Sequence, residues 1–113
     1  MSSRRSNPHR ILAYGHDAVL LQTRCMVLRN AGFQVDAVNS AEELEAYLVE
    51  AKVPYRLTLV GHTVPDDDRA RIAILAEGLS TLVHQLTEPV PPQILIREVT
   101  ERLNEGADTE DQI

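Results

Sequence analysis

The sequence predicts a single α/β domain built on a doubly wound parallel sheet, with four strands and four helices. Short apolar runs typical of buried strands alternate along the chain with segments of helical periodicity. The 113 residues suffice for one domain and leave little for a second. Strict β-α alternation implies right-handed crossovers and helices on both faces of the sheet.

The first strand-helix unit begins with the apolar run 10–15, which ends in a glycine. A helix follows over 18–31, and Asp17 precedes it as a good N-cap residue. Gly32 suits the C′ position of this helix, and Phe33 suits the hydrophobic contact that often follows it. Helical spacing predicts that the buried face of the helix holds Leu21, Cys25 and Leu28.

The second and third units follow the same pattern. Residues 34–38 are expected to form a strand, and Ser40 with Glu43 forms a capping box for the next helix. Residues 55–60 are the third strand. The acidic residues 66–68 then suit the positive end of a helix dipole, so we expect a helix to start there. The buried faces of these two helices are expected to hold Leu44, Leu48, Ala51, Ile72, Leu75, Ala76 and Leu79.

The fourth strand is expected over 80–87, followed by a proline-rich connector in which Pro92 suits the first helical position. The last helix is marked by Ile94, Leu95, Val99 and Leu103. We therefore expect a flexible N-terminal lead over 1–9, a domain over 10–104 and a flexible acidic tail over 105–113.

Composition narrows the function. A net charge of −6 argues against nucleic-acid binding, which requires clustered basic side chains. The single cysteine, Cys25, cannot form an internal disulfide, and no apolar run is long enough for a signal core or a membrane span. We therefore expect a cytoplasmic protein without membrane contact. No phosphate-binding loop, nucleophile-base pair or dinucleotide fingerprint occurs, so we expect neither a cofactor nor an enzymatic activity.

Several segments, in this order, resemble the receiver domain of bacterial two-component response regulators over most of 10–104. Residues 10–17 resemble the first strand and its acidic turn, and residues 31–35 resemble the glycine-aromatic entry to the second strand. Residues 55–65 resemble the third strand, which normally ends in the phosphoacceptor aspartate before a proline. Residues 86–89 resemble the threonine-lysine-proline turn. The resemblance implies a flavodoxin-like fold and a place in phosphorelay signalling.

The departures from the receiver pattern imply a degenerate phosphorylation pocket. Its positions read Gly15, His16, Asp17, Gly61, Thr87 and Glu88. Gly61 falls on the phosphoacceptor and Glu88 falls on the conserved lysine, so the nucleophile is absent and one charge is reversed. Glycine has no nucleophile, and a neutral imidazole such as His16 is a poor Mg²⁺ ligand. We therefore expect a stand-alone pseudo-receiver that binds a protein partner in its pathway without phosphorylation.

The chain is also short by about one strand-helix unit of roughly 30 residues. Either 81–87 is the receiver's fourth strand, with its fourth helix and fifth strand deleted, or the same segment is the fifth strand. The first registration is favoured because it places Thr87 where receivers carry a serine or threonine. An exposed edge strand over 80–87 with Leu82 and Leu86 is a liability in a monomer, so we expect a homodimer through this edge.

The histidines suggest a second hypothesis. His16 and His62 follow strands that neighbour each other in a receiver-like sheet, and with Asp17 they could form a two-histidine, one-carboxylate metal site. The alternative is that the two histidines are polar loop residues left after the acidic pocket was lost. His84 lies in an apolar strand pattern and is expected to be partly buried with a hydrogen-bond partner. The acidic residues 66–68 are explained by the helix dipole without a bound cation.

Overall fold

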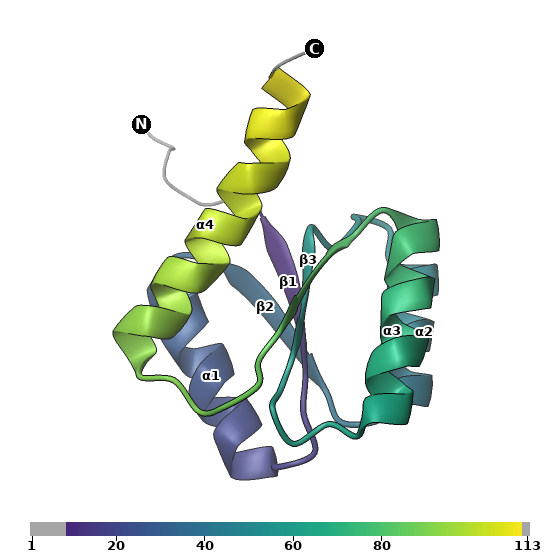
Figure 1. Cartoon of the computed structure of the whole chain (residues 1–113), viewed down its shortest axis with the longest axis vertical. Coiled ribbons are helices and arrows are strands. Elements are labelled where there is room, and N and C mark those ends of the chain that lie inside the picture. Colours follow the sequence, from purple (N-terminus) through teal and green to yellow (C-terminus); the bar gives the residue numbers. More distant parts are fainter. Residues whose placement is uncertain (1–8, 112–113) are drawn as a thin grey trace.

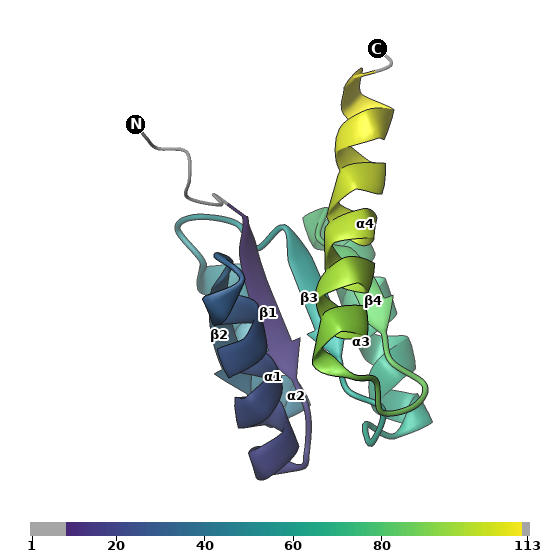
Figure 2. The same cartoon turned by 90° about the vertical axis from the view of Figure 1, so that its left-hand side faces the viewer.

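The structure is a computed structural model that describes the backbone of residues 9–111 and the side chains of residues 9–104. Its sheet has four parallel strands in the order β2-β1-β3-β4 (Figures 1 and 2). The strands are β1 (Arg10–Tyr14), β2 (Gln34–Val38), β3 (Leu57–Val60) and β4 (Leu82–Gln85). The doubly wound α/β fold predicted from the sequence is confirmed.

Two helices cover each face of the sheet. The helices are α1 (Ala18–Asn30), α2 (Ala41–Glu50), α3 (Asp66–Leu79) and α4 (Pro92–Asp111). Helices α1 and α4 lie on one face, and α2 and α3 lie on the other (Figures 1 and 2). None of the helices in the described chain has the length and apolar character needed to cross a bilayer.

The sheet separates two apolar cores. Alternate residues of β1 point to opposite faces, so Ile11 and Ala13 pack under α1 and α4, whereas Leu12 and Tyr14 pack under α2 and α3. All four are at most 1% exposed, as expected for a central parallel strand buried on both sides. The first core also contains Leu21, Cys25, Leu28, Leu95, Val99 and Leu103, and the second contains Val38, Leu44, Leu48, Val60 and Ile72.

The helix ends follow the local chemistry of the sequence. Asp17 caps α1 by accepting a hydrogen bond of 3.1 Å from the Leu20 backbone N–H. Gly32 has a φ of 102°, and the backbone N–H of Phe33 bonds to the Leu28 carbonyl at 3.1 Å, which completes a Schellman motif. Ser40 likewise caps α2 by accepting from the backbone N–H that lies three residues later. The caps predicted from the sequence are therefore confirmed.

Some boundaries differ from the sequence-based expectation. The fourth strand was expected over 80–87, but Ser80 has a left-handed φ of 60° and the Thr81 N–H bonds to the Ala76 carbonyl, so both still belong to the end of α3. Leu79, expected to be buried, is 41% exposed there. Strand β3 starts two residues later than expected, at Leu57.

The last helix is also longer than predicted. Helix α4 continues past Asn104 to Asp111, through most of the segment 105–113 that was expected to be a flexible tail. The expected lead over 1–9 lies outside the described residues except for His9. Strand β4 pairs directly with β3, and α4 follows it without a fifth strand in the described chain, an arrangement that both registrations predict.

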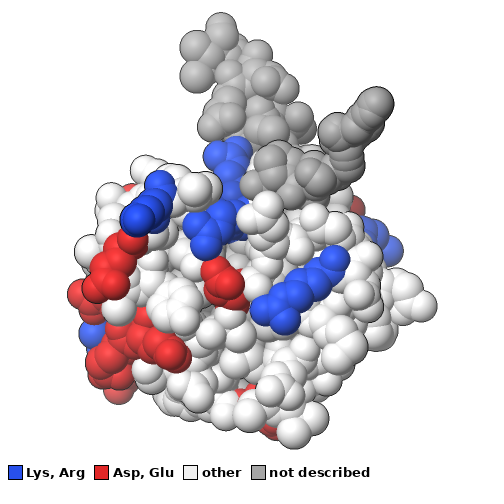
Figure 3. Space-filling model, turned by 180° about the vertical axis from the view of Figure 1, so that it is seen from behind, with Lys and Arg blue, Asp and Glu red and all other residues white. Residues whose placement is uncertain are grey.

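Acidic side chains gather along one side of the molecule, where α2 lies (Figure 3). Glu42, Glu43 and Glu50 are exposed on this helix. Arg71 of α3 donates to Glu45 at 2.8 Å and lies 3.7 Å from Glu42, so it ties the two helices of this face together. Because these pairs are exposed, their contribution to stability is small.

The Schellman glycine gives a matched test of the fold. We expect Gly32→Ala to lower the free energy of unfolding by about 1–2 kcal/mol, because a Cβ is strained at positive φ. The control is Gly78→Ala in α3, where an added Cβ meets no atom within 4 Å. It should stabilise the protein by up to about 1 kcal/mol through helix propensity. Urea unfolding of both variants measures the difference, and effects of the same sign would contradict the assignment.

Candidate functional site at the carboxyl edge of the sheet

The carboxyl ends of β1, β3 and β4 meet at one edge of the sheet. The Gly61 backbone N–H bonds to the Tyr14 carbonyl at 2.8 Å, and the Leu86 N–H bonds to the Val60 carbonyl at 2.8 Å. The three strands therefore stay in register to their last residue. Open α/β sheets bind ligands at this edge, so this edge is the candidate binding or catalytic site.

A buried arginine lies against Gly61, the residue that the sequence aligns with the phosphoacceptor. Arg24 reaches this edge from α1, is only 7% exposed, and its Nη2 donates to His62 Nδ1 at 3.0 Å. A Cβ built on Gly61 would lie 3.0 Å from Arg24 Nη1 and 3.2 Å from the Tyr14 carbonyl oxygen. The guanidinium thus occupies the space that a side chain at Gly61 would need.

The charge of Arg24 persists despite its burial. Desolvation lowers the pKa of Arg24, and the carboxylate of Asp17 opposes that shift. A guanidinium stays protonated in proteins, so a fixed positive charge stands at this edge. Sequence reasoning missed this residue, although its position contains a signal. Arg24 lies three residues after Leu21 and four before Leu28, within the buried stripe of the helix.

A second arginine closes the edge from the other face. Arg69 of α3 donates through Nη2 to the carbonyl oxygens of Gly61 and Leu86, both at 2.8 Å, and through Nε to Val64 at 2.9 Å. One side chain therefore joins the end of β3, the end of β4 and the start of α3. The sequence did not reveal this clamp, because its three acceptors are backbone carbonyls that no side-chain pattern marks.

Tyr14 links β1 to α3 beside these arginines. Its hydroxyl donates to Asp68 Oδ2 at 3.1 Å and lies 2.8 Å from His16 Nε2, from which it accepts. Burial and, to a lesser extent, the bond to Asp68 raise the pKa of Tyr14 to about 12. The hydroxyl is therefore neutral at physiological pH and is no nucleophile.

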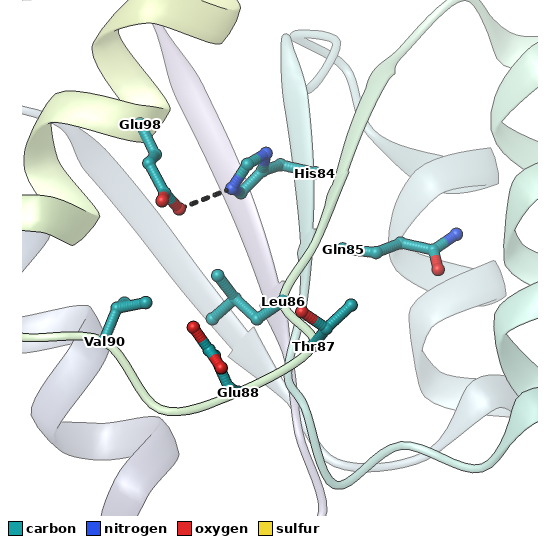
Figure 4. A pocket seen from close by; sticks show the side chains of 7 residues that line it. All are labelled: His84, Gln85, Leu86, Thr87, Glu88, Val90 and Glu98. Carbon is teal, nitrogen blue, oxygen red and sulfur yellow. Dashed lines mark hydrogen bonds and ion pairs between the residues drawn. The ribbon is translucent and has the colours of Figure 1, made fainter.

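The predicted pocket positions fall into two groups. Gly15 and Gly61 are close neighbours, since a Cβ on Gly61 would lie 3.6 Å from the Gly15 Cα. Thr87 and Glu88 instead border a separate cavity of about 170 Å³ between β4 and α4 (Figure 4). Its other lining residues are His84, Gln85, Leu86, Val90 and Glu98.

The hypothetical metal site is not assembled. His16 bonds to Tyr14, His62 accepts from Arg24, and Asp17 caps α1. Among the described residues, no group of three or more histidine, cysteine, aspartate or glutamate side chains is placed to hold a metal ion. Each candidate has a nearer partner, so the two-histidine, one-carboxylate hypothesis has no support in this geometry.

The expectations for the remaining polar residues are met. His84 is partly buried and its Nε2 lies 3.0 Å from Glu98 Oε1, so its predicted hydrogen-bond partner exists. Asp66, Asp67 and Asp68 occupy the first turn of α3, as the dipole argument predicts. Cys25 is buried in the apolar core, and burial raises the pKa of its thiol, which makes it unreactive.

No protein-family model matches the sequence, and no curated protein matches it. Solved structures match its fold. A CheY-like response regulator receiver domain protein from Methanospirillum hungatei gives a TM-score of 0.66 at 18% identity, over 91% of this chain and 99% of that chain. A fusion of the yeast Spc42 trimeric coiled coil to another solved structure gives 0.79 at 19% identity, over 98% of this chain and 87% of that one.

A de novo designed Rossmann 2x2 fold protein also matches, with a TM-score of 0.60 at 20% identity, over 87% of this chain and 90% of that chain. At such identities the comparisons establish the fold, which is structurally similar to CheY-like receiver domains. Because a designed protein shares the architecture, the fold alone does not assign a function.

The environment of Tyr14 predicts a pH-dependent stability. A tyrosine with a raised pKa contributes stability that is complete below its unfolded pKa of about 10 and is lost as the pH rises toward its folded value. That value is about 12 in this protein. The contribution is at most about 3 kcal/mol. Urea unfolding between pH 8 and pH 11 should therefore show a smaller loss in Tyr14→Phe than in the wild type, and equal losses would contradict the assignment.

Proposed function

We propose that this protein is a pseudo-receiver, a protein-interaction module of two-component phosphorelay signalling that acts without phosphorylation. One observation carries the proposal. At the position that resembles the phosphoacceptor, Gly61 has no side chain, and the guanidinium of Arg24 takes the space beside it. The receiver-like fold supports the signalling context.

The chemistry of phosphoryl transfer supports the inactive state. Formation of an aspartyl phosphate requires a carboxylate nucleophile and a divalent cation held by oxygen ligands. Arg24 places a fixed positive charge at this edge, which repels a divalent cation. The two nearby carboxylates already serve other groups, since Asp17 caps α1 and Asp68 accepts from Tyr14.

The edge strand β4 is the proposed contact surface. Hydrogen bonds from the N–H groups of Leu82 and Leu86 to β3 and its flanks fix the register, so the backbone groups of Val83 and Gln85 point away from the sheet. Within the described chain, the N–H of Val83 and both backbone groups of Gln85 lack a hydrogen-bond partner. Such groups favour pairing with another strand, including β4 of a second copy.

Phosphorylation tests the inactive state directly. We expect no phosphoryl adduct by intact mass spectrometry after incubation with acetyl phosphate and Mg²⁺, while an active receiver domain in the same buffer is modified. Gly61→Asp should also stay unmodified, because Arg24 would bind the new carboxylate and oppose Mg²⁺. A stoichiometric adduct on the wild-type protein would overturn the proposal.

Dimerisation tests the contact surface. We expect the wild-type protein to show a weak monomer-dimer equilibrium in sedimentation experiments at high micromolar concentration. Gln85→Pro removes an outward N–H without breaking a bond to β3 and should leave a monomer. The matched control is Ala37→Pro, an exposed position on the opposite edge strand β2, which should dimerise like the wild type. A monomeric wild type would contradict self-association through β4.

A further inference from the structure

An acidic cavity lies directly beside the open edge of β4. Along this strand His84 points toward α4 and Gln85 points toward α3 (Figure 4). The cavity of about 170 Å³ is on the α4 side, and its charged lining residues are Glu88 and Glu98. His84 Nε2 holds the carboxylate of Glu98 at 3.0 Å, so one acidic group is fixed in position.

One extended peptide can use the cavity and the open edge of β4 at the same time. A strand added to β4 pairs with the free backbone groups of Gln85, and its neighbouring side chains then lie on the same face as His84. That face carries the cavity and its two carboxylates. A guanidinium or ammonium group at such a position can form charge-assisted hydrogen bonds with Glu98, which are stronger than neutral ones.

The opposite edge of the sheet lacks this combination. On β2, the Val35 carbonyl accepts two hydrogen bonds from Arg29, at 3.1 Å from Nε and 2.7 Å from Nη2. The cavity of about 480 Å³ beside Ala37 is lined by Arg29 and by no carboxylate. A second cavity of about 250 Å³ beside Ala37 has one carboxylate, Glu43, which already accepts from the Asn39 backbone N–H at 3.1 Å. A basic segment therefore has reason to choose β4 over β2.

We infer that β4 binds an extended segment of a partner protein that places an arginine or lysine side chain between Glu88 and Glu98. This inference rests on the proposed interaction function and names the chemistry of the partner. A second copy of this chain is the weaker occupant. Antiparallel pairing of two β4 strands keeps both α4 helices on one face, so the four glutamates would gather there and repel one another.

Synthetic peptides test the inference. The probe is a fluorescein-labelled acetyl-Thr-Val-Arg-Val-Thr-amide peptide, and the matched probe replaces its arginine with glutamine. Fluorescence anisotropy with the full chain should give about tenfold tighter binding for the arginine peptide. Glu98→Gln should weaken binding of the arginine peptide about fivefold and leave the glutamine peptide unchanged.

Two proline variants locate the site. Gln85→Pro should weaken binding of both peptides more than about tenfold, because it blocks strand addition. Ala37→Pro on β2 should bind both peptides like the wild type. Circular dichroism and the thermal midpoint confirm that each variant is folded before its binding is compared.

The outcomes distinguish the need for a basic side chain in the partner from strand addition at β4. Equal affinities of the two peptides for the wild type, unchanged in Glu98→Gln, would overturn the basic partner while strand addition at β4 stands. Wild-type affinity in Gln85→Pro would overturn the β4 site itself. Neither result bears on the phosphorylation assay, so that assay tests independently whether the protein acts without phosphorylation.

Discussion

The buried guanidinium of Arg24 is the constraint around which the carboxyl edge of the sheet is organised. A charge removed from water is costly unless other groups compensate it. Here the compensation comes from His62, which accepts a hydrogen bond, and from the charge of Asp17 at the start of the same helix. Because the guanidinium reaches the backbone between β1 and β3, a Cβ at Gly61 would make tight contacts and require Arg24 to shift slightly.

Arg69 is a second arginine that stabilises this edge of the sheet. It bonds to the backbone carbonyls of Gly61, Val64 and Leu86 at the strand ends, and polar groups left unsatisfied there are expensive when buried. Two arginines, one from each helical layer, thus stabilise the edge where a receiver-like protein would bind a metal ion and a phosphoryl group.

Local chemistry explains what the sequence could predict. The N-cap at Asp17 and the positive φ of Gly32 depend on a few neighbouring residues, so the helix ends were foreseen. The site depends on contacts between distant residues. Arg24 and His62 are 38 positions apart, and no short pattern joins them. The sequence placed His16 and His62 at the correct edge of the sheet. In the structure, however, each histidine is hydrogen-bonded to a different side chain, His16 to Tyr14 and His62 to Arg24.

The two edge strands, β2 and β4, differ in how many of their outward backbone groups are hydrogen-bonded. Both carry an arginine from the neighbouring helix on an outward carbonyl, Arg29 on Val35 of β2 and Arg102 on Val83 of β4. Such protection limits uncontrolled strand pairing. On β2 the arginine donates to the carbonyl from Nε at 3.1 Å and from Nη2 at 2.7 Å, and on β4 Arg102 donates from Nε at 3.2 Å. Among the described residues, neither backbone group of Gln85, farther along β4, has a hydrogen-bond partner. In the interaction proposed above, recognition is confined to this short stretch of strand, and the neighbouring carboxylates select the partner by charge.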